Sequence, residues 1–329
     1  MTPTRRDILM GLAGGIAAAA IAAPVRAQPF SGVSRLLCGF PAGGTADLTS
    51  RLFAEAWRGK LADNVIVENR VGAGGRLAVT GLKEAAADGR TLLLTPDSVF
   101  TIYTSVYRRL GYDPSLDFSP VSPVCTFAFA LGVGPRVPDT VRTLADFVAW
   151  VKADPGRAQF GVPAAGSAPH FLGDVFYRAI GVTPAHVPYR GSAPAIQDLV
   201  GGHIPAVVTV LGDFLPHRTQ PGMRMLAVTS ATRSRFMPDV PTFTEQGYAA
   251  VTGIENYGIF LPSRAPAAMV DGVARLVREA VAVPAVVEGL SRVGMDPFAQ
   301  TPQAYAQFLD KERVQWRPIV AASGFALDE

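Results

Sequence analysis

Glycine-rich turns that lead into helices are the segments of this sequence best suited to bind a ligand. The first is FPAGGTAD at 40–47, which joins an apolar run to an amphipathic one. Two successive glycines let a ligand reach the backbone without meeting a Cβ atom, and a helix N-terminus supplies unpaired N–H donors with about half a positive charge. The spacing therefore predicts a site for an anion.

Two later segments repeat this arrangement. A short strand runs into GVPAAGSAPH at 161–170, and VPYRGSAPA at 187–195 carries another strand into a helix. Ligands of parallel α/β sheets lie beyond the carboxyl ends of the strands. We therefore expect the three loops to converge on one small ligand.

Catalytic and metal-binding patterns are missing from the sequence. Around Ser167, Ala165 and Pro169 stand where the G-x-S-x-G elbow of a hydrolase needs glycine. The four histidines show no metal-ligand spacing, which favours positions in loops or at the surface. They are His170, His186, His203 and His217. These observations favour a binding protein over an enzyme, with no cofactor and no bound metal.

The elements that must position the loops alternate along the chain. Apolar runs predict strands at 35–40, 64–70, 91–95, 124–133, 206–211, 224–229 and 257–262. Helical spacing predicts a helix from Thr45, one that runs through 82–86, and others at 144–153, 267–282, 284–293 and 302–322. The proline-rich stretch 112–123 is expected to be irregular. The alternation predicts an α/β protein.

Two of these runs, 124–133 and 257–262, suit strands that cross between two lobes. The first lobe is then discontinuous, with residues 28–128 and 253–329, and the second lobe spans 129–252. A cleft between the lobes would hold the ligand.

Composition restricts the protein class further. Hydrophobic residues make up 49% of the 329 residues and charged residues 17%, which excludes a disordered chain. The net charge of +3 comes without a basic cluster that contains aromatic residues, so we expect no nucleic-acid partner. The two cysteines, Cys38 and Cys125, fall in apolar runs. A disulfide stays open, but burial favours two free thiols.

Residues 1–27 are interpreted as an export signal. Arg5 and Arg6 precede an apolar run at 8–23 that is short for a membrane span, and Val25-Arg26-Ala27 offers small residues for a signal peptidase. The paired arginines favour the twin-arginine route, and a general secretory signal, which needs the same positive charge, stays open. Both routes place the protein in the periplasm.

Several runs together resemble one protein family. They are FPAGGTAD at 40–47, VENRVGAGG at 67–75, DGRTLL at 88–93, VPYRGSAPA at 187–195, LAVT at 226–229 and PDVPT at 238–242. In this order they span nearly all of the chain after the export signal. The sequence thereby resembles the Bug or TctC-like extracytoplasmic solute-binding receptors of tripartite tricarboxylate transporters.

The resemblance implies a two-lobed periplasmic binding protein fold of type II, with two crossing hinge strands, that closes on a small carboxylate. It also implies contacts made mainly by backbone amides and water, and the membrane subunits of a tripartite tricarboxylate transporter as partners. We expect a monomer. The expected ligand contacts are Phe40, Ala42, Gly43, Gly44, Thr45, Asp47, Ser98, Phe100, Gly166, Ser167, Ala168, His170, Tyr189, Gly191 and Asp213.

Two aromatic residues depart from the family pattern. Phe100 and Tyr103 stand where polar residues are common after the third strand. Either both rings pack into the lobe, or they form an aromatic wall that favours a monocarboxylate or aromatic carboxylate over citrate. Asp47 and Asp198 stand near helix starts, where a carboxylate either complements the helix dipole or contacts the ligand.

The leading hypothesis is therefore a periplasmic receptor that captures a small carboxylated solute for a tripartite tricarboxylate transporter. A receptor that signals to a membrane kinase would present the same closed shape, so this alternative stays open. An exported enzyme that uses the cleft is the weaker alternative, because the sequence shows no base and nucleophile for it.

Overall fold

The computed structural model describes residues 30–328. The expected export signal, residues 1–27, lies outside the described residues. Within 30–328, no helix combines the length and the apolar character that a membrane span requires.

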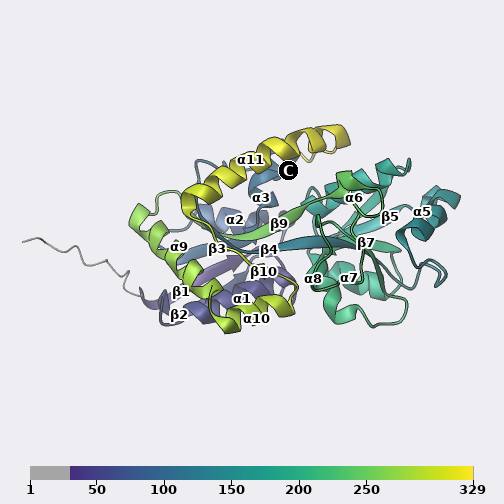
Figure 1. Cartoon of the computed structure of the whole chain (residues 1–329). Coiled ribbons are helices and arrows are strands. Elements are labelled where there is room, and N and C mark those ends of the chain that lie inside the picture. Colours follow the sequence, from purple (N-terminus) through teal and green to yellow (C-terminus); the bar gives the residue numbers. More distant parts are fainter. Residues whose placement is uncertain (1–29, 329) are drawn as a thin grey trace, which may run out of the picture.

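Strands and helices alternate along most of the chain (Figure 1), which confirms the predicted α/β class. The strands are β1 (Phe30–Cys38), β2 (Ala62–Asn69), β3 (Thr91–Pro96), β4 (Phe118–Val133), β5 (Gln159–Val162), β6 (Ala185–Pro188), β7 (Ala206–Val210), β8 (Arg224–Val228), β9 (Ile254–Pro262) and β10 (Asp296–Pro297). The helices are α1 (Thr45–Trp57), α2 (Arg76–Lys83), α3 (Ser98–Thr101), α4 (Tyr103–Val106), α5 (Leu144–Ala153), α6 (Ala168–Ala179), α7 (Ser192–Val200), α8 (Leu211–Phe214), α9 (Ala267–Val281), α10 (Pro284–Arg292) and α11 (Pro302–Ser323).

The strands form two groups that share β4. In the first group β2, β1, β3, β9 and β4 are neighbours in this order, with β1 parallel to β2 and β3. In the second group β4 is followed by β7, β5 and β6, and β8 pairs with β4 as well. The partner of β4 changes from β9 to β7 between Ala128 and Phe129. Figure 1 shows the two halves with β4 and β9 running between them.

Both crossing strands are longer than predicted. β4 begins at Phe118, inside the stretch expected to be irregular, and β9 begins at Ile254. Pro120 and Pro123 fit within β4 because its register with β9 shifts beside each of them, where a missing N–H is tolerated. The proline signals therefore marked bulges in a strand and not a loop.

Other element boundaries differ by a few residues. The strand predicted at 206–211 ends at Val210, and the chain turns there into the short helix α8. The helix expected to run through 82–86 ends at Lys83. The three C-terminal helices agree with the prediction to within about a residue at each end.

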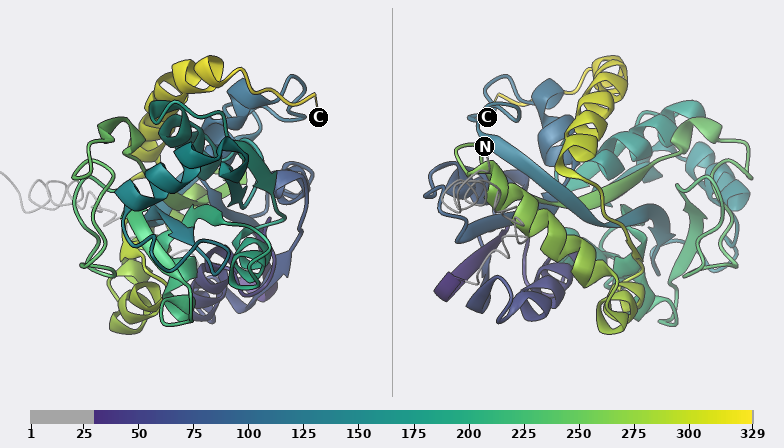
Figure 2. Two further views of the ribbon diagram at one scale, coloured as in Figure 1. Left: turned by 90° about the vertical axis from the view of Figure 1, so that its right-hand side faces the viewer. Right: turned by 60° about the vertical axis from the view of Figure 1, so that its left-hand side comes forward.

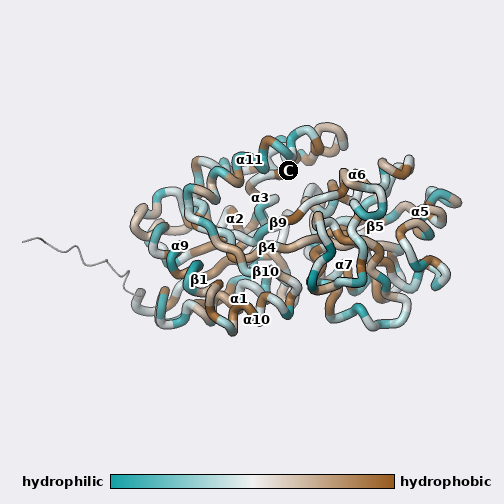
Figure 3. Tube along the Cα trace, viewed as in Figure 1, coloured by the Kyte–Doolittle hydropathy of each residue, from teal (hydrophilic) through white to brown (hydrophobic). Residues whose placement is uncertain are grey.

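Apolar side chains fill the space between the sheet and its helices. α1 and α10 lie on one side of the first-half strands, and α2, α3 and α11 lie on the other (Figures 1 and 2). The hydropathy colouring in Figure 3 shows hydrophobic residues along the central strands. Cys38 and Cys125 are buried and free, which confirms the predicted thiols, and burial raises the pKa of both.

Candidate ligand-binding cleft

A cleft lies where the two halves meet, and it includes residues of β4 and β9. It encloses about 550 Å³ of space, part of it open to solvent. Its walls come from the first glycine-rich loop, the segment after β3, the two crossing strands and the second-half loops. The lining residues are Phe40, Pro41, Gly44, Thr45, Ala46, Pro96, Ser98, Tyr103, Phe127, Phe129, Pro163, Ala164, Ser167, Pro169, Ser192, Ala193, Val210, Glu255 and Tyr257.

Five of the fifteen expected contact residues line this cleft. They are Phe40, Gly44, Thr45, Ser98 and Ser167. The other ten lie behind the wall, at the tip of a loop or in an adjoining hollow. The reasons differ from loop to loop.

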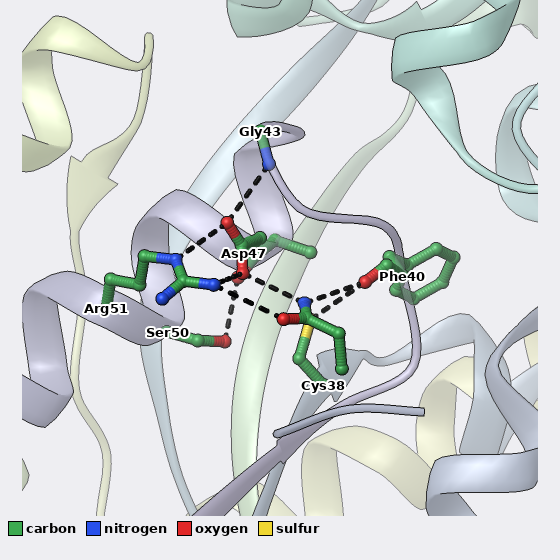
Figure 4. Close-up of polar contacts among 8 residues, drawn as sticks. Cys38, Phe40, Gly43, Asp47, Ser50 and Arg51 are labelled. Atoms are coloured by element: carbon green, nitrogen blue, oxygen red, sulfur yellow. Dashed lines mark hydrogen bonds and ion pairs between the residues drawn. The ribbon is translucent and has the colours of Figure 1, made fainter. Parts of the chain in front are cut away.

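The first loop is held in shape by Asp47 (Figure 4). Its Oδ2 atom accepts hydrogen bonds from Gly43 N–H at 3.0 Å and from Arg51 Nε at 2.9 Å, and its Oδ1 atom accepts one from Asn69 Nδ2 at 2.9 Å. Although burial opposes ionisation, these hydrogen bonds lower the pKa of Asp47. Asp47 and Gly43 are therefore engaged with each other, and Ala42 lies exposed at the tip of the loop.

The two glycines of this loop differ in conformation. Gly43 has φ of 88°, which favours glycine, whereas Gly44 has φ of −78°, which any residue adopts. Of the two, Gly44 lines the cleft. Gly43 N–H is therefore engaged by Asp47 within the loop, and Gly44 is the glycine of this pair at the cleft wall.

Asp213 links the two halves below the cleft. The N–H of Thr45, at the start of α1, donates to Asp213 Oδ1 at 3.1 Å, and the Thr45 hydroxyl lies 3.0 Å from Tyr257 Oη. Burial raises the pKa of Asp213 to about 6, although hydrogen bonds from Ser192, Thr45 and Thr209 limit the rise. Asp213 does not line the cleft, and its carboxyl group instead bridges the two halves through Thr45.

The second loop also presents one residue to the cleft and keeps the others behind it. Ser167 occupies the N-cap position of α6, but its hydroxyl donates to Ala164 O at 2.7 Å, so the side chain does not cap the helix. Gly166 N–H donates to His170 Nδ1 at 3.0 Å. His170 and Ala168 are buried outside the lining.

The expectation that all four histidines lie in loops or at the surface is wrong for His170. It is buried in α6, its ring centroid lies 3.9 Å from that of His186, and ligand atoms of His170, Asp174 and His186 lie within 4.8 Å of one another. Because Gly166 N–H donates to Nδ1, the proton of the neutral ring is on Nε2 of His170. A metal would need that atom free of a proton, so the arrangement disfavours a metal here.

The third loop borders an adjoining hollow that shares Phe40, Pro163 and Ala164 with the cleft. Tyr189 and Gly191 line this hollow, and the Tyr189 hydroxyl donates to Asp198 Oδ2 at 2.6 Å. A Cβ atom on Gly191 would lie 2.6 Å from Pro41 Cδ, so glycine allows the first and third loops to touch.

The two aromatic residues after β3 have different places. Phe100 is 1% exposed and stacks on Phe260 with 4.0 Å between ring centroids, so it belongs to the core and not to the cleft. Tyr103 lines the cleft and donates its hydroxyl to Gly74 O at 2.8 Å. Because this segment is helical, Ser98 and Phe100 point about 200° apart around its axis.

The crossing strands contribute residues that the sequence reasoning missed. Glu255 lines the cleft, and its Oε1 atom accepts a hydrogen bond from Ser98 N–H at 2.7 Å. Burial raises the pKa of Glu255 to about 7, although the hydrogen bonds from Ser98 limit the rise. Tyr257, Phe127 and Phe129 complete this wall. The sequence signal that could have identified Glu255 is a charged residue two positions before the strand predicted at 257–262.

Known proteins share this fold. The family model described as tripartite tricarboxylate transporter family receptor, TctC, matches residues 49–325. Protein BugT of Bordetella pertussis is 32% identical over 99% of this chain and 100% of its own length. The structure of the periplasmic binding protein BugD superimposes with a TM-score of 0.83 at 26% identity, covering 91% of this chain and 99% of BugD.

A third comparison includes a bound ligand. The structure of R. palustris Rpa4515 with adipate superimposes with a TM-score of 0.85 at 27% identity, over 91% of this chain and 99% of that one. The match of the family model over most of the chain, together with the shared fold, confirms the family that the sequence resembles and the two-lobed periplasmic binding protein fold. The chain belongs to the tripartite tricarboxylate transporter receptor family, whose members are solute-binding receptors.

Proposed function

We propose that this protein is a periplasmic receptor that captures a small carboxylated solute in the cleft and delivers it to the membrane subunits of a tripartite tricarboxylate transporter. The observation that carries the proposal is the convergence of three helix N-termini on one cleft. Residues at the starts of α1, α6 and α7 all line it. Their N–H groups and dipoles favour a carboxylate.

The lining residues at these helix starts come from both halves. Gly44 and Thr45 belong to the first half, and Ser167 and Ser192 belong to the second. In the described part of the chain, Gly44 N–H donates no hydrogen bond. The bound adipate of Rpa4515 supports a carboxylate as the class of ligand.

The two halves would act as lobes that close on the solute. We place the boundaries at 128/129 and 252/253, so that residues 28–128 with 253–329 form one lobe and 129–252 the other. The change of partner along β4 supports the first boundary. Thr229 supports both boundaries, because it hydrogen-bonds the first second-lobe residue after one boundary and the first first-lobe residue after the other. Its N–H donates to Phe129 O, and its hydroxyl donates to Gly253 O at 2.6 Å.

A ligand screen followed by solution scattering tests the proposal. Purified protein is screened by thermal shift against mono-, di- and tricarboxylates, and each hit is measured by calorimetry and assayed for turnover. We expect binding without turnover, and a smaller radius of gyration with ligand, because contacts from both lobes form only in the closed state. The scattering mass also tests the expected monomer. Identical profiles with and without a tight ligand would contradict lobe closure, and turnover would favour an enzyme.

A further inference from the structure

The charges around the cleft are of one sign. Among the lining residues, Glu255 is the only one with an acidic side chain, and none is Lys, Arg or His. Two more carboxyl groups, Asp97 and Glu312, border a small hollow on the other side of Glu255. Across residues 30–328, none of these three carboxyl groups has an ion-pair partner within 4.0 Å. A buried carboxylate is stable only when a counter-charge or hydrogen bonds compensate it.

Glu255 is positioned to contact a ligand. The residue is 7% exposed, and it belongs to the lining of the cleft. The hydrogen bond from Ser98 N–H to Oε1 fixes the carboxyl group against the start of α3. It is thus a rigid acceptor at the wall of a ligand site.

Aromatic rings stand beside this carboxyl group. Glu255 lies directly opposite Phe127 in the antiparallel pair of β9 and β4, so the two side chains share one face of the sheet. Tyr257, two residues further along β9, shares that face, and its ring centroid lies 4.6 Å from that of Phe127. A carboxylate next to aromatic faces is the environment that binds an ammonium group, through charge and cation–π attraction.

We propose that the solute is an amino-carboxylate, whose carboxylate binds at the helix N-termini and whose protonated amine binds Glu255 beside Phe127 and Tyr257. This inference rests on the proposed function, because it assigns the solute to the same cleft. A dicarboxylate in this position would bring a second anionic group toward Glu255 with no cation in the lining. An amino-carboxylate matches both the positive and the negative end of the cleft.

The inference predicts how ligand affinity changes with pH. Glu255 must be ionised to bind an ammonium group, and its pKa is raised to about 7. Affinity for an amino-carboxylate should therefore rise from pH 6 to pH 8, by up to about tenfold. A plain dicarboxylate would need protonated Glu255 as a donor, so its affinity would fall over the same range. The groups that face Glu255 are Asp97, Glu312, Tyr103, Tyr257 and Tyr305, and burial raises the pKa of each.

Matched pairs of probes test the inference by calorimetry at pH 6, 7 and 8. Each pair differs by one amine: alanine and propionate, aspartate and succinate, 2-aminoadipate and adipate, phenylalanine and 3-phenylpropionate. The test variant is Glu255→Gln, which keeps an oxygen for Ser98 N–H and removes the charge. The control variant is Glu312→Gln, because Glu312 belongs to the neighbouring hollow and does not line the cleft.

We expect one amino-carboxylate to bind more tightly than its partner without the amine. Glu255→Gln should weaken its binding about tenfold or more and remove the pH dependence. Glu312→Gln should keep the preference for the amine and the rise of affinity with pH, and should only lower the pH at which affinity rises, because the Glu312 charge contributes to the raised pKa of Glu255. A partner without the amine that binds as tightly or more tightly, or an unchanged preference in Glu255→Gln, overturns the inference and leaves the carboxylate receptor standing. If no carboxylate of either kind binds, the proposed function itself is refuted, and the inference with it.

Discussion

Replacing Asp213 by asparagine should change how stability depends on pH. Asp213 in α8 accepts a hydrogen bond from Thr45 N–H across the two halves, and its carboxyl group lies in a largely buried site. Burial raises its pKa from 3.8 to about 6, so the folded protein binds this proton more tightly than the unfolded chain does. The stabilising contribution of Asp213 is therefore complete below pH 3.8 and is lost as the pH rises through about 6.

The size of the effect follows from the pKa. A rise of the Asp213 pKa from 3.8 to about 6 means that the protein loses about 3 kcal/mol of unfolding free energy when the group ionises. This value is an upper limit, because the residue keeps some exposure to solvent. Asparagine stays neutral at every pH but gives up part of the hydrogen bonding, at about 1 kcal/mol. The variant should be about 1 kcal/mol less stable than wild type near pH 4 and about 2 kcal/mol more stable near pH 8.

Urea unfolding at pH 4, 6 and 8 measures this difference. Asp47→Asn is the matched control of opposite sign, because the hydrogen bonds around Asp47 lower its pKa. Its charged form stabilises the fold, so this variant should be less stable than wild type at pH 8, by an amount that shrinks toward acid. Stability curves for Asp213→Asn and wild type that run parallel from pH 4 to pH 8 would refute the reasoning.

Three further predictions concern other parts of the chain. Gly43→Ala should lower the free energy of unfolding in urea by about 1 kcal/mol, because Gly43 has φ of 88°. Gly44→Ala should keep the stability and weaken ligand affinity several-fold, since its methyl group enters the cleft wall. A loss of stability in Gly44→Ala together with a loss of affinity in Gly43→Ala would contradict this assignment. Phe325→Ala should lower the free energy of unfolding by about 1–2 kcal/mol, because the Phe325 ring packs edge-on against the rings of His170 and His186. An unchanged urea midpoint would count against that packing. Replacing Arg5 and Arg6 by lysine should block export by the twin-arginine route, and normal periplasmic accumulation of this variant would exclude that route.

The order of elements in this protein could be predicted because its causes are local. A strand, a glycine-rich turn and an amphipathic helix each depend on neighbouring residues, so 40–47, 161–170 and 187–195 were recognisable as turns before helices. The apolar run at 124–133 indicated a crossing strand for the same reason. Its first residues were missed because the prolines at 120 and 123 signal a loop locally and are accommodated only by the register of β9.

The composition of the site depended on contacts between distant residues. Thr45 and Asp213 are separated by 168 positions, and only the packing of the two halves makes the carboxyl group a bridge. Ser98 and Phe100 are two positions apart, and the helical phase of their segment sends one side chain to the cleft and the other to the core. Glu255 faces the cleft because of its register against Phe127. Helix phase and strand register set the direction of each side chain, and tertiary packing sets what lies in that direction.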